Sequence, residues 1–148
     1  MNNELINVAM YEKGRADALS LQERSIDMTG TELYVECQII PAFKKACEVM
    51  NMLERPIGFV CKSSAGRVVK LIQPYDSTTF TAEPEELPAQ WGFKWSTDPA
   101  KALEFVAIST SPYMRDDCCI ENGIVYRSLI DNNVHSPINY PQGWEEII

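Results

Sequence analysis

Apolar residues in the first part of the chain recur at helical spacing, but irregularly. In residues 2–28 they stand at Leu5, Val8, Ala9, Ala16, Leu19, Ile26 and Met28. A strict heptad would place Glu12, Arg15 and Gln22 on the same seam, so the pattern does not predict a clean coiled coil. It predicts a polar-sided helix with an incomplete apolar stripe. Such a helix either docks on a partner or another copy, or lies on the rest of its own chain.

A second helical pattern begins at Thr29. Thr29 and Glu32 have capping-box spacing, in which the two side chains cap the first turn of a helix reciprocally. Pro41 must break or kink the helical pattern that follows. Residues 1–55 are therefore predicted to form an N-terminal helical segment for attachment or oligomerisation.

Two later stretches are rich in β-forming residues and repeat one another. At an offset of 57, Cys61, Gly66, Val68, Lys70 and Ile72 match Cys118, Gly123, Val125, Arg127 and Leu129. At an offset of 53, Pro84, Pro88 and Trp91 match Pro137, Pro141 and Trp144. Each copy has two β-rich runs around a glycine-bearing turn, which predicts a hairpin. The proline-framed segment is expected to stop strand pairing, and its tryptophan to cover the hairpin face.

The predicted fold class is α+β, with the helical segment followed by two small duplicated three-stranded β modules. The first module spans residues 56–96 and the second spans residues 107–148. Between them, Thr97 or Asp98 is placed to cap a helix that starts at Pro99. Residues 97–106 are therefore predicted to be a short helical linker.

Composition limits the classes of partner. The 148 residues carry a net charge of −8, and Lys and Arg are scattered, which argues against nucleic acid as a partner. Neither a signal-peptide pattern nor a run of eighteen apolar residues occurs in the sequence, so the protein is expected to be made in the cytoplasm and not to enter a membrane.

The sequence does not predict catalytic chemistry. Its paired carboxylates are adjacent in the chain, and adjacent side chains rarely converge on one bond. The single histidine, His135, does not allow a Ser-His-Asp set or a His-based metal site. Cys118 and Cys119 are also adjacent, without the spacing of zinc ligands, so reduced and mostly buried thiols are expected. A non-enzyme without catalytic residues, cofactor or metal is predicted.

The second copy, "YMRDDCCIENGIVYRSLIDNNVHSPINYPQGW", resembles the chitin-binding type of carbohydrate-binding module, families 5 and 12. The matching positions are Tyr113, Asp117, Gly123, Tyr126, Pro137 and Trp144. The first copy keeps Gly66, Pro84, Leu87 and Trp91 but has Val69 in place of the tyrosine. The paired aromatics that follow the second strand in chitin-binding members are absent from both copies, so chitin is not the expected ligand.

A wider resemblance concerns the order of segments. The succession of "MTGTELY", "IPAF", "LPAQWGFKWSTDPAKA" and "VYRSLIDNNVHSP" is similar to that of small proteins encoded in structural gene clusters of bacteriophages and prophages. This resemblance implies a homo-oligomeric virion component, in a head fibre or tail appendage, that contacts other virion proteins through its N-terminal segment. Cell-surface polysaccharide is the further expected partner.

Two functions are consistent with these resemblances. The first is attachment to host-surface glycans, and the alternative is a purely structural decoration of the capsid or tail. Recurrence favours a core role for Gly66, Trp91, Gly123, Tyr126 and Trp144. The glycan candidates are polar or aromatic side chains that do not recur, for which an ordinary half-exposed loop side chain is the alternative: Tyr75, Phe80, Trp95, Asn132, Asn133, His135 and Tyr140.

Overall fold

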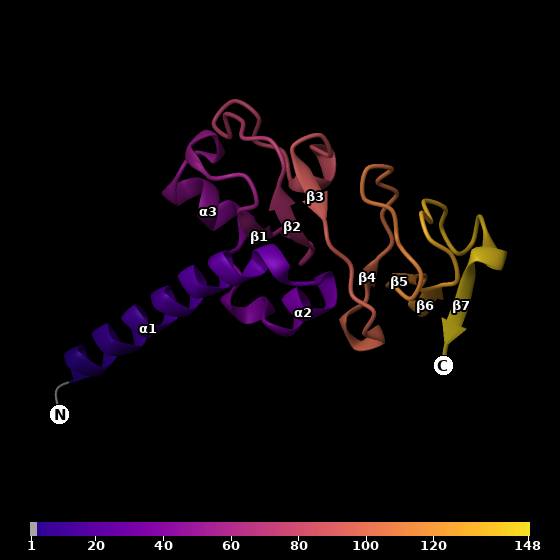
Figure 1. Cartoon of the computed structure of the whole chain (residues 1–148), viewed down its shortest axis with the longest axis horizontal. Coiled ribbons are helices and arrows are strands. Elements are labelled where there is room, and N and C mark those ends of the chain that lie inside the picture. The colour runs from indigo at the N-terminus through magenta and orange to yellow at the C-terminus, as the bar shows by residue number, and fades with distance from the viewer. Residues whose placement is uncertain (1–2) are drawn as a thin grey trace.

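The computed structural model describes the backbone of residues 3–148 and the side chains of residues 13–148. A helical part precedes two β-sheets, one of three strands and one of four, which confirms the predicted α+β class (Figure 1). The side chains of Leu5, Val8 and Ala9, on the apolar stripe predicted above, lie outside the described residues.

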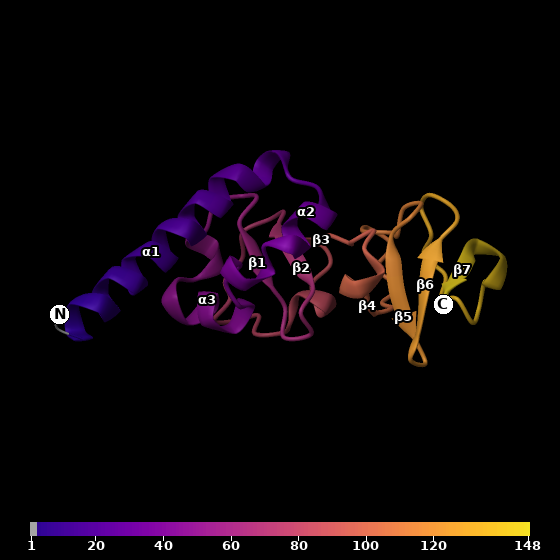
Figure 2. The ribbon, with the colours of Figure 1, turned by 90° about the horizontal axis from the view of Figure 1, so that it is seen from below.

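Helix α1 (Asn3–Arg24) packs on the rest of the molecule near its C-terminal end, and the ribbon of its earlier turns projects from the body (Figures 1 and 2). Leu21 is fully buried there. The Gln22 amide bonds both backbone groups of Val60, accepting from the N–H at 2.9 Å and donating to the carbonyl at 2.7 Å. After the helix, Lys70 Nζ donates to the Ser25 carbonyl at 2.6 Å. These contacts anchor one end of α1 on the first sheet.

Helix α2 (Gly30–Val35) begins with the predicted capping box. Thr29 Oγ1 accepts from the Glu32 N–H at 3.2 Å, and Glu32 Oε1 accepts from the Thr29 N–H at 3.1 Å. A Cβ on Gly30 would collide with the Trp95 carbonyl, so glycine lets the start of α2 approach the backbone of Trp95 closely. Pro41 interrupts the helical pattern as predicted, and α3 (Phe43–Val49) starts two residues later.

The first sheet is an antiparallel meander of β1 (Val60–Lys62), β2 (Val68–Leu71) and β3 (Trp91–Phe93). Its two faces are covered differently. Val60 and Val68 pack with Leu21, Leu33 and Tyr34 of the helices, whereas Cys61, Val69 and Leu71 join the larger core on the other face. This alternation follows from the opposite directions of successive side chains in a strand.

The second sheet has four strands where three were predicted. They are β4 (Leu103–Glu104), β5 (Cys118–Glu121), β6 (Ile124–Ser128) and β7 (Trp144–Ile147), in that order, and β4 runs parallel to β5. The expected linker thus holds a single 3₁₀ turn, Pro99–Lys101, followed by the unforeseen strand β4. Asp98 caps the turn, because its Oδ1 accepts from the Ala100 N–H at 3.0 Å.

The meanders β1–β3 and β5–β7 share strand order and pairing. Trp91 lies opposite Leu71 in the first, and Trp144 lies opposite Ser128 in the second. Gly58 and Asp116 precede the two hairpins with positive φ, 92° and 77°, and their N–H groups donate to the carbonyls of Leu71 and Ser128. These likenesses agree with the predicted duplication, which itself stays a prediction.

The pairing corrects one predicted correspondence. Cys61 lies opposite Val69, and Cys119 lies opposite Tyr126, so Cys119 rather than Cys118 takes the place of Cys61. The first hairpin loop is longer, with a three-residue turn ending in Gly66 where the second has Asn122 and Gly123. The sequence offset of 57 does not account for this extra residue.

Candidate functional site

Of the residues assigned to the repeat core, Trp91 and Trp144 lie in the core and Tyr126 packs against it. Gly66 and Gly123 lie in the hairpin turns instead, where their positive φ is needed, and Gly123 is exposed. Trp91 is 0% exposed and Trp144 is 5% exposed, while Tyr126 is partly buried against the same cluster. Both indole N–H groups are satisfied inside the protein. Trp91 Nε1 donates to Tyr75 Oη at 3.1 Å, and Trp144 Nε1 donates to the His135 carbonyl at 2.8 Å. Neither ring is placed to stack on a ligand.

Three of the seven glycan candidates are also buried. Tyr75 accepts the Trp91 hydrogen bond, and burial raises the pKa of its hydroxyl to about 12. Trp95 is 8% exposed, and its indole N–H donates to the Ser111 carbonyl at 3.0 Å. Asn133 is 0% exposed and donates to Ser128 Oγ and to the Gly143 carbonyl. In this fold the three side chains serve packing, and they leave no free ring or amide for a sugar.

The other four candidates reach solvent, and two of them meet. Phe80, 57% exposed, lies in the loop between β2 and β3. Asn132, His135 and Tyr140 follow β6, and Tyr140 is half-buried. The rings of His135 and Tyr140 are 5.6 Å apart at 46°. A Cβ on Gly143 would collide with the Tyr140 ring, so this glycine lets the ring lie close to the backbone. The His135–Tyr140 pair is the one aromatic pair among the seven that faces solvent.

A stack of aromatic rings joins the two sheets, and sequence reasoning missed its centre. Trp95 stacks on Tyr113 with a centroid distance of 4.2 Å and an interplanar angle of 13°. Phe93 lies against the other side of Trp95, and Phe105 lies against Tyr113. Trp144 of β7 packs edge-on against Tyr113 at 5.5 Å. The tyrosine of the predicted module motif is therefore part of the joint between the sheets.

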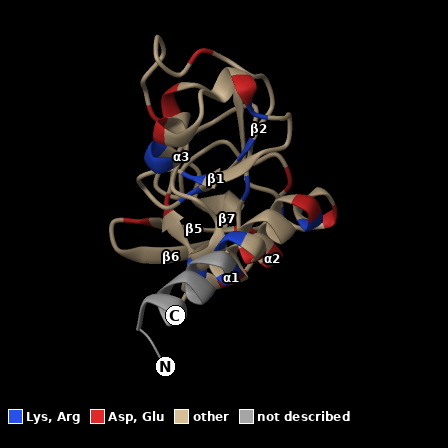
Figure 3. Ribbon diagram, turned by 90° about the vertical axis from the view of Figure 1, so that its left-hand side faces the viewer, with Lys and Arg blue, Asp and Glu red and all other residues tan. Residues whose placement is uncertain are grey.

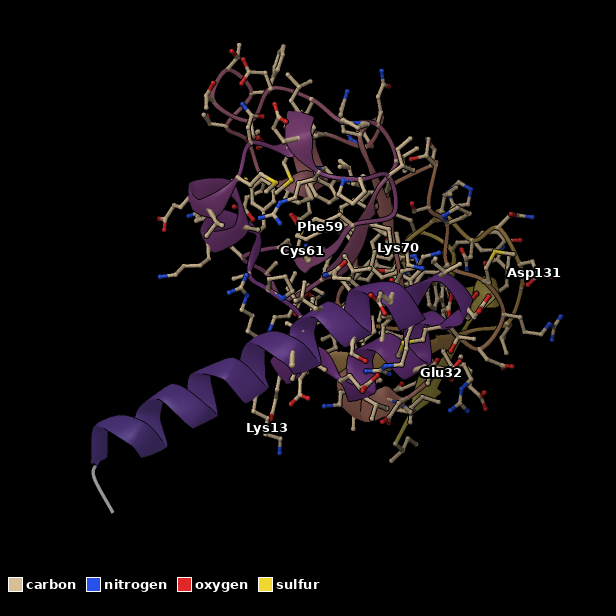
Figure 4. All side chains as sticks on the ribbon, turned by 60° about the vertical axis from the view of Figure 1, so that its left-hand side comes forward. Lys13, Glu32, Phe59, Cys61, Lys70 and Asp131 are labelled. Atoms are coloured by element: carbon tan, nitrogen blue, oxygen red, sulfur yellow. The ribbon has the colours of Figure 1, made fainter. Side chains whose placement is uncertain are left out.

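One surface hollow lies between two helices of the helical part of the molecule. A groove of about 460 Å³ runs between α1 and α3, and most of the surface exposed in it is apolar. Phe59 lies in the body between these helices, whereas Lys13 lies on the opposite side of α1 (Figure 4). We define the α1–α3 groove by its lining residues: Arg15, Ala18, Leu19, Gln22, Pro41, Lys45, Ala46, Val49, Arg55, Pro56 and Phe59.

Large apolar side chains stand open at the α1–α3 groove. Leu19 is 58% exposed and Val49 is 73% exposed. Met50, Leu53 and Ile57, which are also exposed, follow Val49 in the chain. In the sequence, the incomplete apolar stripe on the first helix indicated one wall of this groove. The other wall is formed by residues about thirty positions later in the chain. Contiguous apolar surface of this kind commonly marks a contact with another chain.

Three cations belong to the lining of the α1–α3 groove: Arg15, Lys45 and Arg55. The Arg55 guanidinium lies 4.4 Å from the centre of the Phe59 ring, and its Nη2 donates to the Ala46 carbonyl at 2.9 Å. Arg55 Nε is buried without a hydrogen-bond partner among the described residues. Burial lowers the Arg55 pKa. Figure 3, viewed from the side on which α1 projects, shows a basic stretch at α3. The basic residues of α3 are Lys44 and Lys45.

The paired carboxylates serve different local roles. Asp117 Oδ2 accepts from the Met114 N–H at 2.8 Å, and burial raises the pKa of this carboxyl. Glu85 pairs with Arg67 at 3.5 Å, whereas Glu145 and Glu146 are exposed on β7. Within the described part of the chain, we find no group of three or more His, Cys, Asp or Glu placed to hold a metal ion. The same residues include no helix long and apolar enough to cross a membrane.

Comparison of the chain with protein-family models, with curated proteins and with solved structures found no match. Two features of the structure bear on function, namely the α1–α3 groove and the His135–Tyr140 pair.

Proposed function

We propose that the chain is a non-enzymatic structural component of a bacteriophage virion and that it works through contacts with other protein chains. The virion setting is supported by the order of sequence segments described above. The contact role is supported by the α1–α3 groove, where Leu19 and Val49 leave large apolar surfaces open beside a projecting helix. This groove is the observation that carries the proposal.

The arrangement of aromatic residues favours this role over sugar binding as the main function. A sugar site needs rings that face solvent, with amides or carboxylates beside them. Trp91, Trp95 and Trp144 are all buried, and their indole N–H groups bond to partners inside the fold. The exposed apolar surface lies instead on the helical part, where a protein partner is the usual occupant.

Attachment to a host-surface glycan is the second candidate function, and the His135–Tyr140 pair favours it. The two rings meet at the solvent-facing side of the second sheet's last loop, with the exposed Asn132 in the same loop. A site of this size would bind one sugar weakly. Many copies on one particle would still raise avidity, by about two orders of magnitude or more.

The main proposal is tested on intact particles. Phage particles from a host that encodes this chain would be banded on a density gradient and analysed by quantitative mass spectrometry. We expect the chain in the particle band at a copy number comparable with known structural proteins. Its absence from purified particles would contradict the proposal.

A matched pair of variants tests the contact role. Leu19 and Ile138 are each 58% exposed, but only Leu19 lines the α1–α3 groove. We expect Leu19→Asp to lower incorporation into particles about tenfold or more, and Ile138→Asp to leave it unchanged. Equal incorporation of the two variants would show that the α1–α3 groove is not the contact surface.

The glycan alternative is tested by retention of the pure chain on host cell-wall polysaccharide. If it holds, Tyr140→Ala and His135→Ala reduce retention about tenfold, and Phe80→Ala does not. Tyr75→Ala and Trp95→Ala are unsuitable, because both side chains are part of the core. The purely structural role is favoured if the chain is not retained, or if Tyr140→Ala and His135→Ala are retained as well as wild type. Release of sugar products would instead indicate an enzyme.

A further inference from the structure

The α1–α3 groove lies between two helices and could bind a third helix. On α1, Arg15, Ala18, Leu19 and Gln22 follow i, i+3, i+4, i+7 spacing and so share one helix face. The facing wall is α3, with Lys45, Ala46 and Val49. Pro56 and Phe59 complete the lining. Grooves between two helices commonly take the apolar face of an amphipathic helix from another molecule.

The sequence of α1 itself supplies a face of mixed apolar and charged residues that could pair with its own copy. Leu5, Val8 and Glu12 precede Arg15, Leu19 and Gln22 at alternating spacings of three and four residues. Leu5, Val8 and Glu12 are placed here by sequence position alone, because their side chains lie outside the described residues. This seam is self-complementary about the point between residues 13 and 14. Two antiparallel copies would bring Val8 opposite Leu19 and Glu12 opposite Arg15.

The shape of the molecule makes this seam accessible. The N-terminal turns of α1 project away from both sheets (Figures 1 and 2). From Lys13 to Asp17 every residue is exposed, and Leu19 remains open where α1 reaches the body. A second chain therefore meets no obstacle from the described residues along this stretch.

We propose that two copies of the chain associate by antiparallel pairing of their α1 helices, with the N-terminal half of each α1 lying in the α1–α3 groove of the other copy. The contact is isologous, because the same surface is used on both copies. The inference rests on the proposed function, a role in assembly, and identifies the first partner as a second copy.

Charge favours the antiparallel direction. Each chain carries a net charge of −8, so two copies repel one another overall. In the antiparallel arrangement, two Glu12–Arg15 pairs would offset part of this repulsion. The partner's helix would also lie in a groove that contains Lys45 and Arg55. A parallel, in-register pairing would instead place Arg15 against Arg15 and Glu12 against Glu12.

The first test is the oligomeric state of the full chain by sedimentation equilibrium. We expect a dimer at about 50 μM, with a dissociation constant in the micromolar range. Val49 and Val35 form a matched pair, because each is exposed and ends a short helix, but only Val49 lines the groove. Val49→Asp is expected to raise the dissociation constant about tenfold or more, and Val35→Asp to leave it unchanged.

The second test fixes the direction of pairing. Arg15→Glu and Glu12→Arg each place like charges together, so each variant alone dimerises more weakly than wild type. An equal mixture of the two restores both opposite-charge pairs and returns the dissociation constant to the wild-type value. Recovery in the mixture also demonstrates that both variants are folded. Lys13→Glu is the matched control, since it makes the same charge change on α1 outside the seam and leaves dimerisation unchanged.

Three outcomes would overturn the inference. They are a chain that is monomeric at about 50 μM, equal weakening by Val49→Asp and Val35→Asp, and a mixture that pairs more tightly than wild type, which indicates parallel helices. A failure of the proposed function would be seen in a different experiment, as absence of the wild-type chain from purified particles. A dimer of the pure chain together with absence from particles would keep the pairing and reject the virion role.

Discussion

At the residue scale, a polar side chain can bind a ligand only if its hydrogen-bond donors and acceptors are not already paired inside the fold. Tyr75, Trp95 and Asn133 do not recur between the two β-rich stretches. For this reason the sequence predicted that they bind a ligand. The structure uses all three as packing residues with internal hydrogen bonds. Their partners, such as the Ser111 carbonyl, become neighbours only in the folded chain. Sequence spacing carries no signal for such contacts.

Trp95→Ala is expected to destabilise the protein strongly. It removes a buried indole from between Phe93 and Tyr113, and substitutions of this type cost about 3–5 kcal/mol. Urea unfolding measures the loss. Trp95→Phe keeps a ring but loses the bond to Ser111, so a smaller loss of about 1–2 kcal/mol is expected. Phe80→Ala, at an exposed ring, is the control and changes stability by less than about 0.5 kcal/mol.

Asp76 gives the stability of the loop before β3 a defined pH dependence. Its carboxylate accepts hydrogen bonds from the Thr78 hydroxyl at 2.6 Å, the Asn51 amide at 2.9 Å and the Thr79 hydroxyl at 2.9 Å. These bonds, that from Thr78 first, lower the Asp76 pKa from the ordinary value of 3.8. The stabilisation is therefore present above pH 3.8 and is lost as the pH falls below it, through the lowered pKa.

Thermal unfolding of wild type and Asp76→Asn measures this effect. We expect wild type to have the higher midpoint at about pH 7, and the difference to shrink as the pH is lowered to about 2. A difference that stays constant over this range would show that the charge of Asp76 plays no part.

At the element scale, the sequence predicted those features that depend on neighbours in the chain. The Thr29 capping box, the interruption at Pro41 and the cap at Asp98 are all set by residues within a few positions of one another. Strand β4 was missed because two residues cannot display alternation, and its pairing is decided by the free edge of β5. The α1–α3 groove was missed because its walls come from separate elements.

Gln22 provides a test of how α1 is attached to the first sheet. Its amide satisfies the N–H and the carbonyl of Val60, an edge-strand residue that is fully buried. Gln22→Ala leaves both groups without their partner, and we expect a loss of about 1–3 kcal/mol together with faster hydrogen exchange at the Val60 amide. Exchange at Val125 in the second sheet serves as the internal control. Unchanged protection at Val60 would contradict the proposed anchoring of α1.

At the scale of the whole molecule, the two sheets share one core. The largest buried cluster takes Trp91 and Phe93 from the first sheet and Cys119 and Trp144 from the second. Arg67 adds a polar link, since it lies in the first hairpin and its Nη2 donates to the Glu104 carbonyl of β4 at 2.6 Å. The sequence predicted two modules joined by a short helical linker at residues 97–106, and it did not predict this shared core.

Arg67→Met tests the link between the sheets. Arg67 is 8% exposed, and its loss leaves the largely buried Glu85 without its cation, so we expect a decrease of about 3 kcal/mol in urea unfolding. The double variant Arg67→Met with Glu85→Gln is expected to recover part of this loss, because no unpaired charge remains. Equal losses in the single and double variants would show that the unpaired Glu85 charge does not destabilise the protein.

The position of β4 determines where the chain can be divided. Leu103 and Glu104 pair with one edge of β5, and the Ser96 carbonyl accepts from the Cys118 N–H at 2.9 Å. A cut at residue 107 would uncover a row of backbone donors and acceptors, which other chains could pair with and which would promote aggregation. A fragment built from the second half must therefore start at or before Trp95, so that it keeps both the strand β4 that covers β5 and the indole that stacks on Tyr113.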